Sequence, residues 1–378
     1  VGITKEVLEN LRTQIAAQQE PWFSYYKDML ESPAASRSIT SSNQHASDPA
    51  QPAFTGFASQ GDNSRFIADS LKVYTQSLMY YITGDEVYRE NAMRLIRIWA
   101  QMNPAQYAYF SDAHIHTGIP LNRMVTGAEI MRYTDSQIPS LDWTEDDTLN
   151  FTNNLVTPVI ETFQYDKNHF MNQHLYPLMG AMAGYIFTDN KPRYEEAVEW
   201  MTVNASAVNQ GFNGSIKQLF RLVDTDAATG LPVNPPRVQH VEMGRDQAHG
   251  GGDLNNAAII ARMFLAQDTR VDPVSGEFSI AGNAVDIYQF LDDRILAAAD
   301  YFWQFMIGYE TPWTPTPFSM VDGDIWGIYY RLSDAYRGRL LTANFWDLYY
   351  YYTYVRNENL EQIAPYFYEA FKKRVPTI

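Results

Sequence analysis

The most polar short stretch of the chain is VEMGRDQAHGGGD, residues 241–253. Arg245 offers a planar guanidinium that suits a carboxylate, and His249 can move a proton near neutral pH. The glycines at 250–252 lack the spacing and the Lys-Ser/Thr of a phosphate-binding loop. We expect them to let the backbone pass close to a ligand or a neighbour. The stretch therefore predicts a functional site, with a salt-bridge knot of Arg245 and the nearby acids as the alternative.

A second polar cluster is KNHFMNQHLYP, residues 167–177. Because Pro177 is tolerated in the first turn of a helix, we expect Asn172 and His174 to lie in the loop before that helix or in its first turn. The backbone amides at a helix N-terminus bind carboxylates. The cluster predicts carboxylate donors, and the alternative is that these side chains cap the helix.

A third candidate lies in DIYQFLDDRILAAADYFWQF, where Arg294 and Tyr301 are two helical turns apart and share nearly one face. A tyrosine that faces a cation has a lowered pKa, which would help it act near neutral pH. Periodicity alone is a weak reason to select one of 26 tyrosines. The pair His114 and His116 lacks an HExxH or similar ligand set, so we predict no metal and no cofactor.

The elements that must position these residues are helical. Three segments pair an apolar helix with a helix that has one polar face, at 71–101, 177–205 and 345–374. Further helices are predicted at 121–134, 148–164, 255–267 and 283–308, whereas strand patterns are scarce. The pattern predicts an all-α fold, an (α/α) toroid of six or seven helical hairpins, and a solenoid is the structural alternative.

Length and composition indicate one large globular domain over residues 1–378. The 46% of hydrophobic residues can form a large core, and no second linker divides the chain. Residues 33–65 are rich in Ser, Ala, Pro and Gly, which predicts a long surface segment. The chain has no Cys, so disulfides and thiolate metal sites are excluded.

Charge and hydropathy limit the partners. A net charge of −16 argues against nucleic-acid binding, and no apolar run is long enough to cross a membrane. The first residue is Val1 rather than Met, which suggests a removed presequence and hence secretion. Three glycosylation sequons, at Asn150, Asn204 and Asn213, are about as many as chance gives.

The polar clusters resemble the alginate-lyase-like polysaccharide lyases. The pieces that carry the resemblance are MNQHLY, EMGRDQAH, the pair Tyr288 and Arg294, and DYFWQFMIGY. The resemblance is closest to polysaccharide lyase family thirty-eight and extends over most of the chain after about residue 60. It implies an (α/α) toroid that cleaves uronate polymers, such as alginate, polymannuronate or glucuronan, by β-elimination. It also implies a secreted, extracellular or periplasmic monomer whose partner is an anionic polysaccharide.

The resemblance also implies roles for particular residues. Asn172, His174 and Arg245 would neutralise the uronate carboxylate, and His249 and Tyr301 would form the acid-base pair, with Tyr288 as the alternative tyrosine. Which of the pair removes the C5 proton stays open. We expect further substrate contacts from Gln173, His116, Arg123, Tyr288, Arg294 and Trp326.

Two other functions fit the same residues. A glycoside hydrolase would use paired carboxylates, with Glu242, Asp246 and Asp253 as candidates. A non-catalytic protein would bind a uronan and leave it unchanged.

Overall fold

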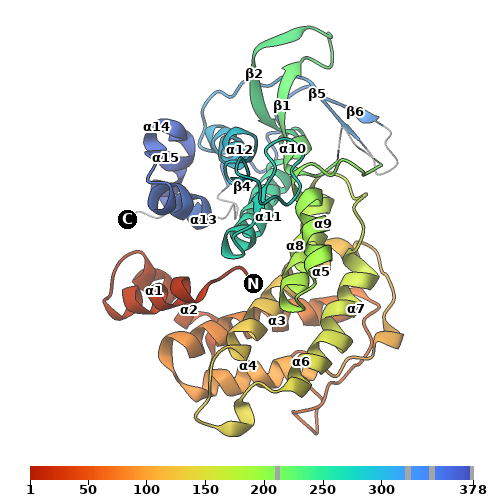
Figure 1. Ribbon diagram of the computed structural model, residues 1–378, viewed down its shortest axis with the longest axis vertical. Helices are drawn as coiled ribbons and strands as arrows, with labels where there is room; N and C mark the ends of the chain where they lie inside the picture. Colours follow the sequence, from red (N-terminus) through yellow and green to blue (C-terminus); the bar gives the residue numbers. More distant parts are fainter. Residues whose placement is uncertain (209–212, 320–324, 340–344, 375–378) are drawn as a thin grey trace. The chain divides into compact units, whose positions relative to one another are not determined.

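Helices make up most of the chain, and the predicted all-α class is confirmed (Figure 1). The computed structural model describes residues 1–208, 213–319, 325–339 and 345–374, and at Ser319, Ile325 and Trp326 it describes the backbone alone. The described strands are short and form three two-stranded antiparallel sheets. Helical hairpins, the building blocks of an (α/α) toroid, are the main motif.

The chain divides into two compact units. Unit 1 comprises Val1–Tyr165 and Tyr176–Lys191, and unit 2 comprises Asp166–Leu175 and the residues from Pro192 onward. The single domain over residues 1–378 stays a prediction.

Unit 1 is entirely helical apart from its loops. Its main helices are α3, α4, α5 and most of α8, and π-helical turns at 152–156 and 160–164 join α6 and α7 into one helical segment. The bounds are α1 Lys5–Ala16, α2 Trp22–Glu31, α3 Gln60–Thr83, α4 Glu86–Trp99, α5 Ala113–Arg132, α6 Glu145–Phe151, α7 Thr157–Val159 and α8 Asn172–Phe187.

The hairpin predicted at 71–101 is present as α3 and α4. Gly84 ends α3 in the left-handed conformation (φ +69°), and the Asp85 side chain caps α4 by accepting from the amide of Val87. α3 also packs closely on α5 at Gly127. A side chain at this position would lie only 2.7 Å from Val73. The turn residues Gly84 and Asp85 thus define this hairpin, and Gly127 allows α5 to pack on it.

The segment 33–65 has little secondary structure before α3 begins, but it is anchored rather than loose. The buried carboxylate of Asp69 accepts hydrogen bonds from the Ser41 hydroxyl (2.5 Å), the Ser42 amide (2.8 Å) and the Trp99 indole (3.0 Å). Lys72 lies 2.9 Å from the same carboxylate. Polar contacts to α3 and α4 therefore replace the regular hydrogen bonds that this Ser- and Pro-rich sequence does not form.

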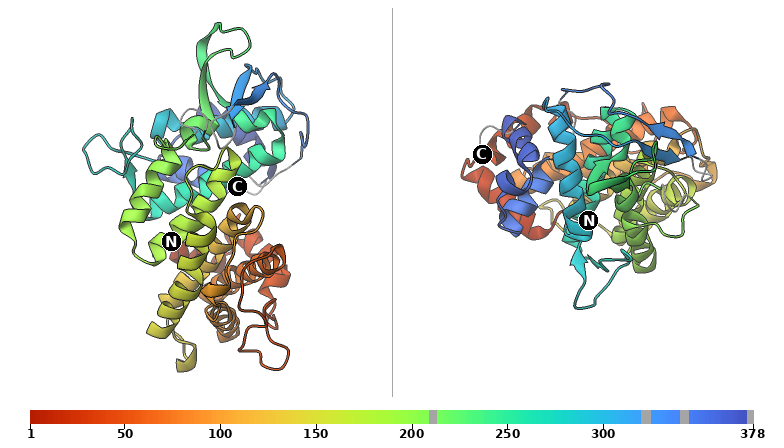
Figure 2. Two further views of the ribbon diagram at one scale, coloured as in Figure 1. Left: turned by 90° about the vertical axis from the view of Figure 1, so that its right-hand side faces the viewer. Right: turned by 90° about the horizontal axis from the view of Figure 1, so that it is seen from above.

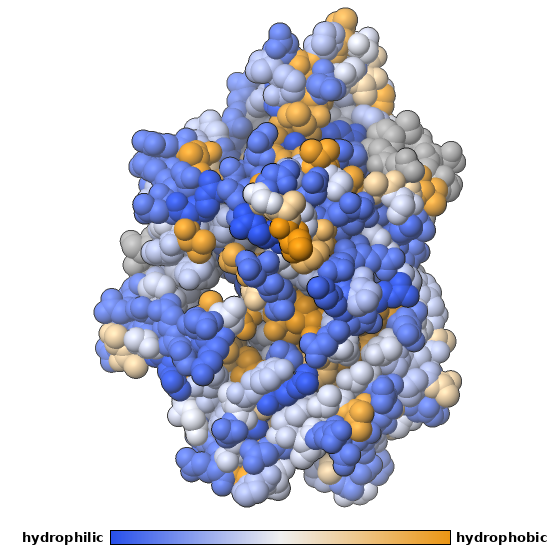
Figure 3. Space-filling model, in the orientation of Figure 1, coloured by the Kyte–Doolittle hydropathy of each residue, from blue (hydrophilic) through white to orange (hydrophobic). Residues whose placement is uncertain are grey.

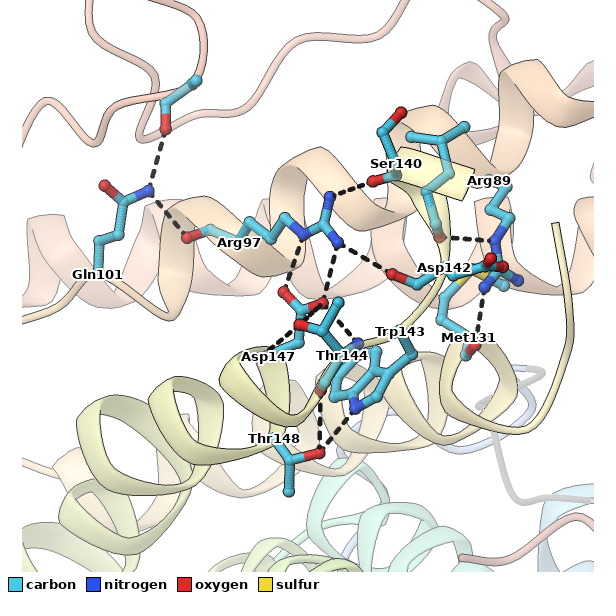
Figure 4. A network of polar contacts seen from close by, with 12 residues as sticks. Arg89, Arg97, Gln101, Met131, Ser140, Asp142, Trp143, Thr144, Asp147 and Thr148 are labelled. Carbon is cyan, nitrogen blue, oxygen red and sulfur yellow. Dashed lines mark hydrogen bonds and ion pairs between the residues drawn. The ribbon is translucent and has the colours of Figure 1, made fainter. Parts of the chain in front are cut away.

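A second buried ion pair ties α4 to the start of α6 (Figure 4). The Arg97 guanidinium donates to both carboxylate oxygens of Asp147, at 2.8 and 2.9 Å, and to the carbonyls of Ser140 and Asp142. Asp147 is also the third residue of α6 and forms a capping box with Thr144. One carboxylate therefore serves two elements.

Unit 2 holds the strands as well as helices. The helices are α9 Lys191–Thr202, with all but its first residue in unit 2, α10 Ile216–Leu219, α11 Gln247–Ala266, α12 Phe290–Met306, α13 Phe345–Tyr350, α14 Leu360–Ile363 and α15 Pro365–Arg374. The strands are β1 Phe220–Thr225, β2 Pro232–His240, β3 Arg270–Val271, β4 Val285–Asp286, β5 Thr316–Ser319 and β6 Ile325–Tyr329.

The β1–β2 hairpin was not predicted from the sequence. Its two strands lie side by side in both views (Figures 1 and 2), with Phe220 opposite His240 and Val223 opposite Arg237. Pro232, Pro235 and Pro236 interrupt the strand pattern, which is why β2 escapes a search for alternating residues. The hairpin leads the chain directly into the stretch 241–253.

The surface is mixed, as the net charge suggests. On the face in Figure 3, hydrophobic residues lie in small groups among hydrophilic ones. No helix in the described part of the chain is long and apolar enough to cross a membrane.

We expect Asp147→Ala to lower the free energy of unfolding by about 2–4 kcal/mol, because it removes both the helix cap and the charge-assisted bonds of Arg97. Chemical denaturation at neutral pH measures the loss. Asp146→Ala, an exposed acid in the same turn, is the control and should cost less than about 1 kcal/mol.

The same pair predicts a pH dependence. Burial raises the pKa of Asp147, but hydrogen bonds from Arg97 and Thr144 outweigh it, and the pKa lies below the ordinary value. The stabilisation is thus present above the unfolded-state pKa of about 4 and is lost as pH falls through the lower folded-state pKa. The gap between wild type and Asp147→Ala should shrink in acid, and a constant gap would contradict this account.

Candidate active site

The stretch 241–253 lies in unit 2, between the end of β2 and the first turns of α11. A short 3₁₀ turn, Val241–Gly244, follows β2, and Asp246 is the N-cap of α11. One Asp246 oxygen accepts from the His249 amide at 2.9 Å, and the other lies 2.6 Å from Nδ1 of the His249 ring. Since an ionised carboxylate only accepts, Nδ1 carries the hydrogen and Nε2 presents its lone pair.

The three glycines lie inside a helix, whereas the sequence predicted a helix only after them. α11 begins at Gln247, eight residues before the predicted helix at 255–267. Gly250 packs closely on protein rather than leaving open space, because a side chain there would lie 3.2 Å from Met243 and 3.4 Å from Phe302. The glycines cost helix propensity, and close packing at Gly250 offsets part of that cost.

Arg245 is exposed and does not form the salt-bridge knot that was the alternative to a functional site. Within the described residues, its guanidinium makes no hydrogen bond or ion pair, although its charge acts on the buried acids Glu242 and Asp253. A guanidinium fork without a protein partner, next to an oriented imidazole, is suited to an external carboxylate.

Two buried carboxyl groups, Glu242 and Asp253, feel the charge of Arg245. Burial raises the pKa of Glu242, partly opposed by Arg245, and raises the pKa of Asp253 well above its ordinary value, with Glu242 adding to the increase. His240 Nε2 lies 3.6 Å from Asp253 and 3.0 Å from the Gly250 carbonyl, and burial lowers the pKa of His240 to about 4. His240 is thus neutral near pH 7, so its proximity to Asp253 is not an ion pair.

The polar cluster at 167–177 reaches the same site. Asn172 begins α8 and so lies in its first turn, but Pro177 lies inside the helix and not in its first turn as predicted. The backbone amide of Asn172 donates to Glu242 Oε1 over a long 3.4 Å contact. Met171, just before it, takes a left-handed φ of +45°. Gly214 is needed beside it, because a side chain there would lie 2.1 Å from the Met171 carbonyl oxygen. The structure therefore brings together Asn172, Glu242 and Arg245.

His174 has a different environment from the one predicted. It is only 1% exposed, and its Nε2 lies 2.8 Å from the Trp200 carbonyl oxygen, so that nitrogen carries the hydrogen. Burial lowers its pKa to about 4, which leaves Nδ1 as an acceptor. A neutral His174 in this tautomer cannot donate to a carboxylate, so the geometry suits it to positioning the start of α8.

Tyr329 is the site residue that the sequence did not reveal. It ends β6, its ring stacks on Phe318 at 4.0 Å, and its carbonyl accepts from the Trp313 indole at 2.9 Å. The ring lies against Gly244, where a side chain would meet it at 2.5 Å. Burial and then Glu242 raise the pKa of Tyr329, while Arg245 lowers it. The only signal in the sequence was Gly244, which admits this ring.

Tyr301 does not have the lowered pKa that was expected from Arg294. Its hydroxyl donates to the Pro312 carbonyl at 2.6 Å, burial raises its pKa, and the cation that acts on it is Arg237. Arg294 instead donates to the Phe220 carbonyl at 2.9 Å. The residues Leu291–Asp293 have positive φ, but Arg294–Tyr301 follow them in regular helix, so the predicted spacing holds and the two side chains bind different backbone carbonyls.

The other predicted contacts are spread over the two units. In unit 2, Tyr288 is 1% exposed and stacks on Tyr351 at 3.9 Å, Gln173 lies half-buried in the first turn of α8, and the Trp326 side chain lies outside the described residues. In unit 1, His116 is exposed and Arg123 is half-buried, both on α5. These roles stay predictions.

Two further expectations concern ions and glycans. No group of three or more acidic or His side chains in the described part of the chain could hold a metal ion. Asn204 and Asn213 are fully buried and their amides donate to backbone carbonyls, so these two sequons are inaccessible in the folded protein, whereas Asn150 is exposed.

Comparison with known proteins supports the resemblance seen in the sequence. Residues 55–216, less than half of the chain, match the model of the alginate lyase family, and the match includes MNQH but ends before EMGRDQAH. A solved structure of an alginate lyase from Bacteroides ovatus is similar at 12% identity and a TM-score of 0.45, over 80% of this chain and 90% of that chain. No curated protein matches. The predicted resemblance is confirmed: over residues 55–216 the chain is alginate-lyase-like.

Proposed function

We propose that the chain is a polysaccharide lyase that cleaves a uronate polymer by β-elimination. The observation that carries the proposal is an exposed Arg245, unpaired among the described residues, near a His249 whose ring is oriented by Asp246 at 2.6 Å. The match of residues 55–216 to the alginate lyase family supports it. Polymannuronate, other alginates and glucuronan are the proposed substrates, and no cofactor is required.

The first task is to neutralise the uronate carboxylate, because a carbanion beside an ionised carboxylate is high in energy. Arg245 supplies a full positive charge where negative charge develops in the transition state. Asn172, held beside Glu242 at the N-terminus of α8, supplies a neutral donor. His174 positions the start of α8 through its hydrogen bond to the Trp200 carbonyl.

His249 suits the base and Tyr329 the acid. Nε2 of His249 takes the C5 proton, and the electrons of that C–H bond form the C4=C5 double bond as the C4–O4 bond breaks. The departing O4 takes the proton of the Tyr329 hydroxyl, and solvent returns both groups to their starting states. A phenol with a raised pKa keeps its proton until a strong base forms next to it, which fits the acid role.

A glycoside hydrolase fits the site less well. Glu242 and Asp253 are buried behind Arg245, and Asp246 is committed to His249 and to the cap of α11. A pair of acids facing a glycosidic bond from two sides is therefore not formed by these three groups. A non-catalytic uronan-binding protein remains the second candidate, since Arg245 alone could bind a uronate.

The remaining features of the proposal follow from the resemblance. We propose membership of polysaccharide lyase family thirty-eight, a single catalytic domain, a monomer, and a secreted, extracellular or periplasmic location. These statements extend beyond the matched residues 55–216.

We expect the protein to produce ultraviolet absorbance from unsaturated uronate on polymannuronate, polyguluronate or glucuronan. Tyr329→Phe should reduce the initial rate at least about 100-fold, because it removes the proposed acid. Tyr301→Phe, which loses only a bond to a backbone carbonyl, should retain the rate within about tenfold. The opposite order would move the acid role to Tyr301, and new reducing ends without absorbance would exclude the lyase.

Asp246→Asn separates helix capping from imidazole orientation. Asn caps helices as well as Asp does, so α11 and the thermal midpoint should be nearly unchanged. The amide cannot hold the same His249 tautomer, so kcat should fall by about 100-fold or more while KM changes little. Equal kcat in wild type and variant would show that the Asp246 contact has no part in the chemistry.

A further inference from the structure

A buried polar stripe runs along α11 behind the proposed site. Asp253 lies one helical turn after His249, and Asn256 follows about one turn later on the same side. Both are fully buried, and neither carboxylate oxygen of Asp253 nor either amide atom of Asn256 has a hydrogen-bond partner among the described residues. Buried polar atoms without partners destabilise a fold, so their retention calls for a functional reason.

The charged groups around Asp253 come from three elements. Asp253 shares α11 with His249 and the cap Asp246, the turn before α11 supplies Glu242 and Arg245, and the end of β2 supplies His240 at 3.6 Å. Tyr329 from β6 acts electrostatically on the same group of charges. The charge of Arg245 thus acts on Glu242 and Asp253, whereas Asp246 is bound to His249.

The protonation of the two buried acids decides how much positive potential Arg245 presents to a ligand. A neutral Asp253 leaves the guanidinium charge uncompensated. An ionised Asp253 in a low-dielectric surrounding attracts the same guanidinium and repels an incoming carboxylate.

We propose that Asp253 is a positioning residue that controls how strongly Arg245 attracts a uronate carboxylate, without touching the substrate itself. The inference rests on the proposed function, since it assumes that Arg245 binds a uronate. The orphaned oxygens of Asp253 support it, because a carboxyl group with a purely structural role would be hydrogen-bonded.

The direction of the pH effect follows from burial. The pKa of Asp253 is raised well above its ordinary value, so the group stays protonated in mild acid and ionises only as pH rises further. A uronate is ionised throughout this range, since carboxylic acids of this type titrate near about pH 3–4. Affinity for a uronate should therefore fall as pH rises.

The test is the dissociation constant of D-mannuronate and D-glucuronate, which have no glycosidic bond to cleave, measured by calorimetry from about pH 5 to pH 9. Wild type should lose about three- to tenfold in affinity across the range, a tenfold change corresponding to one pKa unit of coupling. Asp253→Asn should keep the high-affinity level over more of the range and retain only the smaller pH dependence that Glu242 contributes. In turnover, the variant should flatten the pH dependence of KM and change kcat little.

Asp300→Asn is the matched control. Asp300 is also a partly buried acid with a raised pKa, but it lies on α12 and accepts from the amides of Tyr366 and Phe367. It should keep the wild-type profile.

Glu242→Gln gives an independent reading if Asp253→Asn fails to fold by circular dichroism. Glu242 raises the pKa of Asp253, so its loss should move the fall in affinity to lower pH. Parallel profiles in wild type, Asp253→Asn and Glu242→Gln would overturn this inference alone. No uronate binding at any pH, together with no unsaturated product, would overturn the proposed function instead.

Discussion

The contact between Asp246 and His249 is the interaction on which the candidate site depends. One carboxylate caps α11 through the His249 amide and fixes the His249 ring through Nδ1. The start of the helix and the orientation of the imidazole are therefore set by the same group. Because α11 begins there, Gly250, Asp253 and Asn256 fall inside a helix, and Arg245 is left just outside it with its guanidinium exposed.

The second feature of the site is that four titratable groups are buried without an ion-pair partner among the described residues. Glu242, Asp253, His174 and His240 are all buried, and the pKa of each is shifted toward its neutral form. The shift of the two acids toward their neutral forms reduces the negative charge near the exposed Arg245, in a protein with a net charge of −16. The positive charge of Arg245 gives a polyanion a place to bind despite long-range repulsion, which salt screens beyond about 10 Å.

The hairpin of α3 and α4 could be predicted from the sequence, because its signals are local. Gly84, Asp85 and the apolar spacing of 71–101 are enough to define α3, the turn and α4. The positions of Gly250 and Tyr329 could not be predicted. Three consecutive glycines disfavour a helix, and only packing on Met243 and Phe302 explains Gly250 there.

Tyr329 and Tyr301 show the same limit at the level of the site. Tyr329 reaches Gly244 from a strand 85 residues later, so no spacing rule links them. Tyr301 was selected by helical periodicity relative to Arg294, but each of the two side chains donates to a different backbone carbonyl, of Pro312 and of Phe220. Chemistry could be inferred from residue types, whereas the partner of each group required the tertiary structure.

The tautomer of the His249 ring shows most directly whether Asp246 orients this imidazole for catalysis. Nitrogen-15 NMR of protein labelled at histidine, with the His249 signals assigned through His249→Gln, reports which ring nitrogen carries the hydrogen. We expect a neutral ring that carries its hydrogen on Nδ1 and none on Nε2, and we expect Asp246→Asn to lose that preference. A ring protonated at Nε2, or one unaffected by Asp246→Asn, would contradict this expectation.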